Sequence, residues 1–127
     1  MKRVPIETPY GILRGRDAIY LDRITVEDCT RTLVLEGAVS RVTKHPLDID
    51  FSGYSLRFSG VLAFRCVELD STRWEWDASF EEILDSDWVR TLGGKVSSRH
   101  RHFFIQTYDD VFDVVCDHFE FVPTKKA

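Results

Sequence analysis

Alternating apolar and polar positions run through most of the chain and predict a protein built mainly of β-strands. The clearest stretch covers residues 100–122 and reads HRHFFIQTYDDVFDVVCDHFEFV. Its first half places Phe103 and Ile105 on one face and His102 and Phe104 on the other. A polar break at residues 108–110 separates this half from a second apolar half. We interpret the stretch as a β-hairpin near the centre of one domain.

The second half of this hairpin also fits a helix. Its three aspartates between residues 110 and 117 would share one helical face, with Val111 and Val114 on the opposite face. Val and Phe favour strands, and Phe119 and Phe121 continue the alternation. A strand is the preferred interpretation, but the pattern alone leaves both structures open for residues 111–118.

Two further regions predict antiparallel strands. Residues 17–25 and 31–40 alternate on either side of a polar break and pair most simply as a hairpin. Gly37 inside the second of these strands indicates a bulge or a close backbone approach. Residues 51–70 form two strands, or one long bent strand, with Ser59-Gly60 as the bend.

The helical signal is confined to residues 79–92. Ser79 and Glu82 match a capping box, and Gly93-Gly94 gives a stop signal. The weak helix formers of residues 85–87 could interrupt this helix, with Ser86 as a second cap.

Apolar residues at helical spacing within residues 79–92 predict which face of this helix is buried. Trp88 falls on the face of Phe80 and Leu84, so we expect all three in the core. On that basis Trp88→Ala should cost about 3–5 kcal/mol of stability.

These elements predict an α+β fold: a mainly antiparallel β-sheet, as a sandwich or partly closed barrel, with one helix at about residues 79–92. At 127 residues, 43% of them hydrophobic, the chain suits a single domain over residues 1–127. Residues 1–16 are expected to be an irregular lead-in because Pro and Gly interrupt them, and residues 123–127 a frayed tail. No apolar run reaches the roughly 20 residues of a membrane span, and no signal peptide is evident, which predicts a cytoplasmic protein.

Charge is distributed unevenly along the chain, although the net value is only −4. Between residues 68 and 87 there are many acids and a single base, Arg73. This balance disfavours nucleic-acid binding, which needs a basic stripe, and favours a basic protein partner. The predicted contact residues are the acids on the exposed side of the expected helix: Glu81, Glu82, Asp85 and Asp87.

The three cysteines, Cys29, Cys66 and Cys116, are scattered and form no C-x-x-C pair. We therefore expect small buried hydrophobes, with neither disulfide nor zinc. His100 and His102 would lie on one strand face and could bind a metal only with further ligands, such as Asp109. The prediction is that the protein has no metal, no cofactor and no catalytic residues.

Trp74 and Trp76 alternate with charged residues in RWEWD and so share one strand face. Packing in or at the rim of the core is the first interpretation, and an interface the second. The pattern leaves this choice open.

The segments SFEEILDSDWVRTL and RHFFIQTYDDVFDVV, joined by a short basic linker, resemble small bacterial proteins. Some of these are encoded beside polymorphic or contact-dependent toxins as immunity proteins. The resemblance covers roughly residues 33–122 and implies a non-enzymatic protein that binds and neutralises a cognate toxin, with no catalytic residues.

A second hypothesis is a small enzyme or ligand-binding β-domain that uses the His100/His102 face. A pocket lined by ionisable groups would favour this hypothesis. A flat acidic face with a partly exposed Trp would favour toxin binding.

Overall fold

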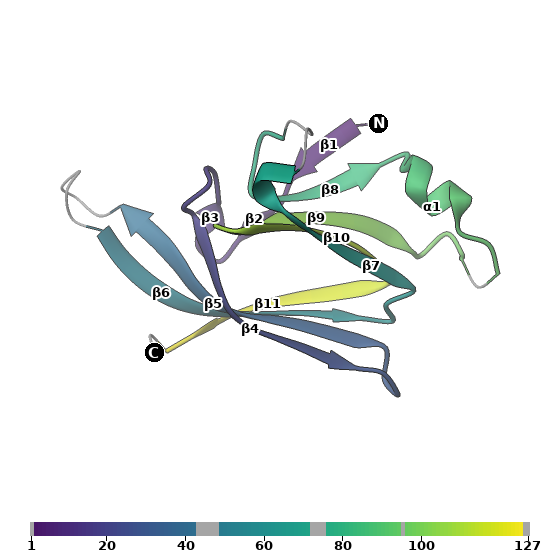
Figure 1. Cartoon of the computed structure of the whole chain (residues 1–127), viewed down its shortest axis with the longest axis horizontal. Coiled ribbons are helices and arrows are strands. Elements are labelled where there is room, and N and C mark those ends of the chain that lie inside the picture. The colour runs from purple at the N-terminus through teal and green to yellow at the C-terminus, as the bar shows by residue number, and fades with distance from the viewer. Residues whose placement is uncertain (1, 43–48, 72–75, 95, 126–127) are drawn as a thin grey trace.

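Two antiparallel β-sheets face each other in the computed structural model, which describes residues 2–42, 49–71, 76–94 and 96–125 (Figure 1). The five-stranded sheet has the order β1 (Lys2–Pro5), β8 (Phe80–Leu84), β9 (Arg101–Gln106), β10 (Asp110–Cys116) and β7 (Ala63–Glu68). The four-stranded sheet has the order β11 (His118–Thr124), β6 (Ile49–Ser59), β5 (Thr32–Val42) and β4 (Ile19–Glu27). A small hairpin joins β2 (Glu7–Thr8) to β3 (Gly11–Ile12). The expectation of a mainly antiparallel β protein is confirmed, and the two sheets do not close into a barrel.

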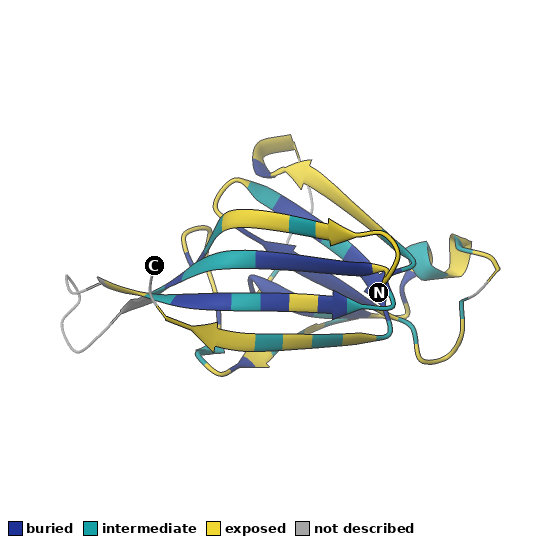
Figure 2. Ribbon diagram, turned by 90° about the horizontal axis from the view of Figure 1, so that it is seen from below, coloured by how far each residue is buried: buried dark blue, intermediate teal, exposed yellow. Residues whose placement is uncertain are grey.

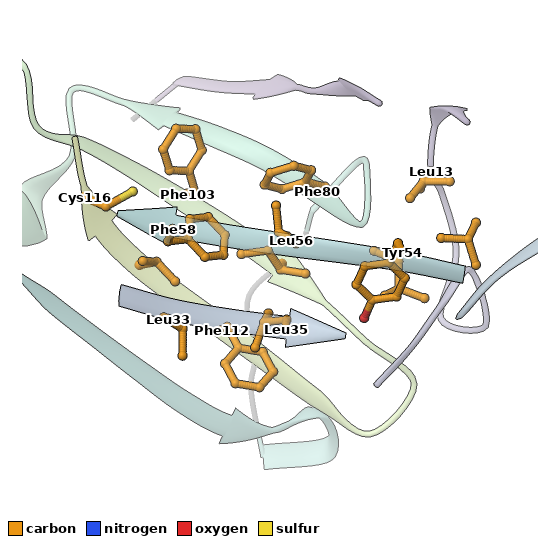
Figure 3. Close-up of a cluster of buried hydrophobic side chains, with 14 of the residues drawn as sticks. Leu13, Leu33, Leu35, Tyr54, Leu56, Phe58, Phe80, Phe103, Phe112 and Cys116 are labelled. Atoms are coloured by element: carbon orange, nitrogen blue, oxygen red, sulfur yellow. The ribbon is translucent and has the colours of Figure 1, made fainter. Parts of the chain in front are cut away.

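The main hydrophobic core lies between the two sheets (Figure 3). Alternate residues of each strand point into it, as the pleat of a strand requires. Phe103 and Ile105 enter from β9, and Phe112 from β10, all at most 1% exposed. Leu56 and Phe58 of β6 meet them from the other sheet. Burying such large side chains is the main favourable contribution to folding.

The hairpin predicted for residues 100–122 is present only in part. β9 and β10 pair as expected, so residues 110–116 are strand and not helix. The second arm then ends at Asp117, and the chain crosses to the other sheet, where β11 pairs with β6. The strand from Phe119 onward is therefore separate from β10.

A second crossing between the sheets lies beside this one. β6 and β7 belong to different sheets and are joined at Gly60, the predicted bend. Gly60 has a φ of +64°, and a Cβ there would lie 2.6 Å from the Asp117 carboxylate. A glycine is thus required where the two crossings meet.

The predicted hairpin of residues 17–25 and 31–40 is confirmed as β4 and β5. Their register shifts between Leu21 and Arg23, opposite Gly37, so that a bulge is present as predicted. A Cβ on Gly37 would lie 2.0 Å from the Tyr20 carbonyl oxygen. The glycine permits this close approach.

Both chain ends are more regular than the sequence suggested. β1, inside the expected lead-in, pairs with β8 at the edge of the five-stranded sheet. β11 extends to Thr124, inside the expected tail.

The helix predicted for residues 79–92 is wrong. Residues 80–84 form β8, which pairs with β1 on one side and β9 on the other. Ser79 caps no helix, because its Oγ donates to the Gly15 carbonyl at 2.8 Å. Phe80 and Ile83, which matched helical spacing, lie on opposite faces of the sheet, in separate clusters. Both faces of this strand are buried, so its apolar positions do not simply alternate.

The helical part of the fold consists of α1 (Asp87–Thr91) and the 3₁₀ turn η1 (Leu69–Ser71) among the described residues. α1 begins at the second cap that the sequence indicated. The Ser86 Oγ accepts a hydrogen bond from the Val89 N–H at 3.2 Å, as an N-cap residue does.

Candidate functional site

The outer face of the five-stranded sheet carries a second, smaller hydrophobic cluster. Leu69, Ile83, Phe104 and Val111 are buried there, with Trp76 packed against them. Beside this cluster is a cavity of about 170 Å³. Its lining combines aromatic, aliphatic and ionisable side chains: Arg3, Arg65, Ile83, Asp87, Trp88, His102, Phe104 and Asp113.

A chain of hydrogen bonds forms one wall of this cavity. His102 of β9 is 3% exposed, and its Nδ1 lies 2.7 Å from the Ser86 Oγ. Its Nε2 lies 2.6 Å from Oδ1 of Asp113 on the neighbouring strand β10. These bonds attach the start of α1 to the middle of the sheet.

Arg65 continues this chain from Asp113 to α1. It lies directly opposite Asp113 in the register of β7 and β10, and its Nε donates to Oδ2 of Asp113 at 3.2 Å. The guanidinium carbon is 4.4 Å from the centroid of the Trp88 ring, a cation–π distance. Trp88 also packs edge-on against His102, with 5.3 Å between ring centroids. This series of contacts therefore begins and ends at α1. It runs from the N-cap Ser86 through His102, Asp113 and Arg65 to Trp88.

The charge state of Asp113 follows from these contacts. Burial raises the pKa of its carboxyl, but the hydrogen bonds and charges of His102 and Arg65 outweigh burial and lower it. The carboxylate is thus ionised and accepts from the Nε2–H of His102.

Arg3, which also lines the cavity, belongs to a buried ion pair. Nη1 of Arg3 lies 2.9 Å from Oε1 of Glu81, whose side chain is 0% exposed. Oε2 of Glu81 accepts from the backbone N–H groups of Asp77 and Ala78 at 3.1 and 3.0 Å. The Arg3 guanidinium is 5.2 Å from the centroid of the Phe104 ring. Both arginines of the cavity therefore hold a carboxylate and lie over an aromatic ring.

Ser86, His102 and Asp113 have the composition of a catalytic triad, but the geometry indicates a positioning role. A nucleophilic hydroxyl needs open space for a substrate atom about 3 Å away. Ser86 is 6% exposed, and its Oγ already accepts the N–H of Val89. We interpret the three residues as the support of the cavity wall.

The acids predicted to form one partner-binding face do not do so: Glu81, Glu82, Asp85 and Asp87. Glu81 is wholly buried in its pair with Arg3, and Glu82 points to the other face of β8, where Arg101 binds it at 2.7 and 2.9 Å. The expected helical face is absent because residues 80–84 are a strand, in which neighbouring side chains point to opposite faces.

The two histidines are not brought together as a pair of ligands. His100 precedes β9, and its Nδ1 accepts from the Ser97 N–H at 2.9 Å, while His102 is held by Ser86 and Asp113. Asp109 lies beyond the far end of β9, in the turn to β10. In the described ranges no three His, Cys, Asp or Glu side chains cluster as a metal site would require.

The expectation of three buried cysteines is correct for one of them. Cys116 is buried, and burial raises the pKa of its thiol to about 12. Cys29 and Cys66 are exposed, the first in the turn after β4 and the second on the edge strand β7. A hydrophobic cysteine in a turn or at a sheet edge has no neighbouring sheet to cover it.

Trp88 is half-buried on α1 and does not join Phe80 in the main core, which corrects the predicted helix face. Trp76 packs on Phe104, with 5.1 Å between ring centroids, and its Nε1–H donates to the Gln106 side-chain oxygen at 3.3 Å. Trp76 is thus a packing residue of the outer cluster, whereas Trp74 lies outside the described residues.

Because Trp88 is partly exposed, Trp88→Ala should cost about 1–2 kcal/mol, less than a core tryptophan. Urea denaturation followed by circular dichroism would measure this loss. A loss above about 4 kcal/mol would show that Trp88 is fully buried.

Acid should weaken the cavity wall through Asp113. Its lowered pKa means that its bonds stabilise the folded state above the unfolded-state pKa of about 3.9 and that this contribution is lost as the pH falls through the lower, folded-state pKa. We expect Asp113→Asn to be less stable than the wild type at neutral pH. The two free energies of unfolding should converge below about pH 4. Urea melts of both proteins at several pH values would test this. A difference in free energy of unfolding that stays constant across this pH range would contradict the assignment.

The sequence pointed to His102 but not to Arg3, Arg65 and Asp113, which line the same cavity. Only the strand register reveals them, since Asp113 lies opposite Arg65 and Arg3 opposite Ile83. No helix within the described residues has the length and apolar character of a membrane span. No protein-family model, curated protein or solved structure matches the chain. The site is therefore interpreted from its own geometry.

Proposed function

We propose that the protein binds a small organic anion, a carboxylate on a flat apolar body, in the cavity on the outer face of the five-stranded sheet. The observation that supports this proposal is the pair of guanidinium groups, Arg3 and Arg65, placed over the aromatic rings of Phe104 and Trp88 in one cavity. Ligand sites are typically concave and apolar, with a few converging polar groups. This pocket lined by ionisable groups favours the ligand-binding hypothesis, while toxin neutralisation stays a prediction.

The two arginines have hydrogen-bonding capacity left for an anion. A guanidinium carries five N–H donors in a planar fork that matches a carboxylate. Within the described part of the chain, Arg3 donates through Nη1 to Glu81, and Arg65 donates through Nε to Asp113. The side chain of Arg65 is 46% exposed, so its outer nitrogens are accessible from solvent. An incoming carboxylate can thus bind without breaking either ion pair.

The wall that would contact the ligand is already held in place. His102, Asp113 and Arg65 fix Trp88 through a continuous set of contacts to three strands, β9, β10 and β7. A site that is ordered before binding spends less of its interaction free energy on ordering side chains. Trp88 would then stack on the flat body of the ligand while the arginines bind its charged group.

Benzoate and its neutral analogue benzamide provide the test. Titration into labelled protein, followed by NMR, should move the Trp88 indole N–H and the amides of residues around the cavity. Benzoate should bind at least about tenfold more tightly than benzamide, the equivalent of about 1.4 kcal/mol from the charge-assisted bonds. Peptides ending in a free carboxylate or in an amide would show whether the same group is recognised on a protein.

Arg65→Gln should abolish the preference for benzoate. The matched control is Arg14→Gln, since Arg14 has a similar exposed fraction, 51%, and pairs with Asp77 away from the cavity lining. Equal binding of benzoate and benzamide, or binding that Arg65→Gln leaves unchanged, would contradict the proposal.

A further inference from the structure

The four outer strands of the two sheets differ in how they are protected against pairing with another chain. Exposed sheet edges are commonly protected by Pro, Lys or a bulge. β1 carries Lys2 and Pro5, β11 carries Pro123, and β4 contains the bulge opposite Gly37. β7 has the sequence AFRCVE, a register with β10 free of shifts, and exposure along most of its length (Figure 2). Among the four described edges it is the one with neither Pro, Lys nor a register shift.

Alternate backbone groups of β7 point away from β10. The Leu69 N–H donates to the Asp109 carbonyl at 2.8 Å, which fixes the alternation of the antiparallel ladder. Residues 63, 65 and 67 therefore direct their N–H and C=O groups to β10, and residues 64, 66 and 68 direct theirs outward. No described strand pairs with this outer side.

An apolar groove of about 210 Å³ opens beside this edge, between β7 and the neighbouring edge strand β4. Phe64 of β7 and Val26 of β4 form its rim and are 39% and 55% exposed. Leu33 and Val61 are buried at its floor. Glu27, Asp28 and Arg31 add charged groups to the lining, which carries one net negative charge. The Asp28 side chain is 97% exposed and lies 3.9 Å from the Arg31 guanidinium.

A second copy of this chain is a poor occupant for the edge. Antiparallel pairing of β7 with itself, using the outward groups, would place Cys66 opposite Cys66 and Phe64 opposite Glu68 of the second copy. That carboxylate would then approach the acidic rim at Glu27 and Asp28, a like-charge contact that disfavours pairing.

We infer that β7 is a docking edge for an extended segment of a different protein, which adds a strand beside Phe64, Cys66 and Glu68. The segment places an apolar side chain in the groove and a basic one against Glu27 and Asp28. Main-chain hydrogen bonds would give affinity, and the groove would give specificity, as in other strand-addition complexes. This edge and the anion cavity share the strand β7, since Arg65 lies between Phe64 and Cys66, but the residues that line the groove do not line the cavity.

The probes are three capped peptides in which Lys and Val, Glu and Val, or Lys and Pro alternate at every second position, with threonine between them. This spacing puts both side chains of each pair on the strand face that meets the groove. The Lys-Val peptide should shift the backbone amides of residues 64, 66 and 68 in NMR spectra, and should bind at least about tenfold more tightly than the Glu-Val peptide. The Lys-Pro peptide lacks an N–H at each proline that would face β7, and should bind at least about tenfold more weakly than the Lys-Val peptide.

Phe64→Lys should weaken binding of the Lys-Val peptide by about tenfold or more, through charge and loss of the apolar rim. Val122→Lys on β11 is the matched control, since Val122 is 40% exposed on another edge. Glu27→Lys with Asp28→Lys, at the end of β4 and in the turn that follows it, should transfer the preference to the Glu-Val peptide.

Three results would overturn the inference. The first is that neither strand-forming peptide moves the amides of β7. The second is equal binding of the Lys-Val and Glu-Val peptides. The third is a dimer of the protein in light scattering that disappears in Phe64→Lys, which would assign the edge to a second copy.

Discussion

Replacing Glu81 with alanine should lower the free energy of unfolding by about 3–5 kcal/mol, because it breaks a buried ion pair. The Glu81 side chain is 0% exposed, and its two oxygens bind the Arg3 guanidinium and two backbone N–H groups. Removing the carboxylate leaves those N–H groups without an acceptor in a dry site, where each lost bond is costly. Chemical denaturation at neutral pH would measure the change.

Glu82, the next residue, provides the control. It lies on the other face of β8 and binds Arg101, whose side chain is 44% exposed. A pair accessible to solvent contributes little, so Glu82→Ala should cost about 1 kcal/mol or less. Similar losses for the two variants would show that Glu81 is not the buried partner of Arg3. Arg3→Ala should reproduce most of the Glu81 effect, because it leaves the buried Glu81 carboxylate without its ion-pair partner.

Most strands could be predicted from the sequence because one of their faces alternates clearly. β4 and β5 follow this pattern, and Gly37 marks their bulge. β8 does not, because Phe80 enters the main core while Glu81 and Ile83 are buried on the outer face. The segment FEEIL then imitates helical spacing. Long-range pairing with β1 and β9 decides its structure, and local sequence cannot encode that.

The candidate site was predictable only through His102. Its partner Asp113 was identified as one of a group of acids, with no sign that it faces a histidine. Arg3 and Arg65 lie far from it in the sequence and reach the cavity through the pairing of β1 and β7 with their neighbours. The crossing at Asp117 was equally hidden, since β10 and β11 have the same alternating character. These contacts depend on strand register, which one sequence does not specify.

Phe112→Ala should cost about 3–5 kcal/mol, as expected for a phenylalanine removed from a packed core. The ring is 0% exposed between the two sheets, on the strand whose opposite face carries Asp113 (Figure 3). Its loss leaves a cavity that β10 cannot close without disturbing the ladders to both β7 and β9. Phe51→Ala is the matched control, because Phe51 is 38% exposed, and its loss should be much smaller. A loss below about 1 kcal/mol for Phe112→Ala in urea melts would mean that the sheets do not pack around this ring. The same variant should weaken benzoate binding if β10 moves, since Asp113 follows directly and holds Arg65.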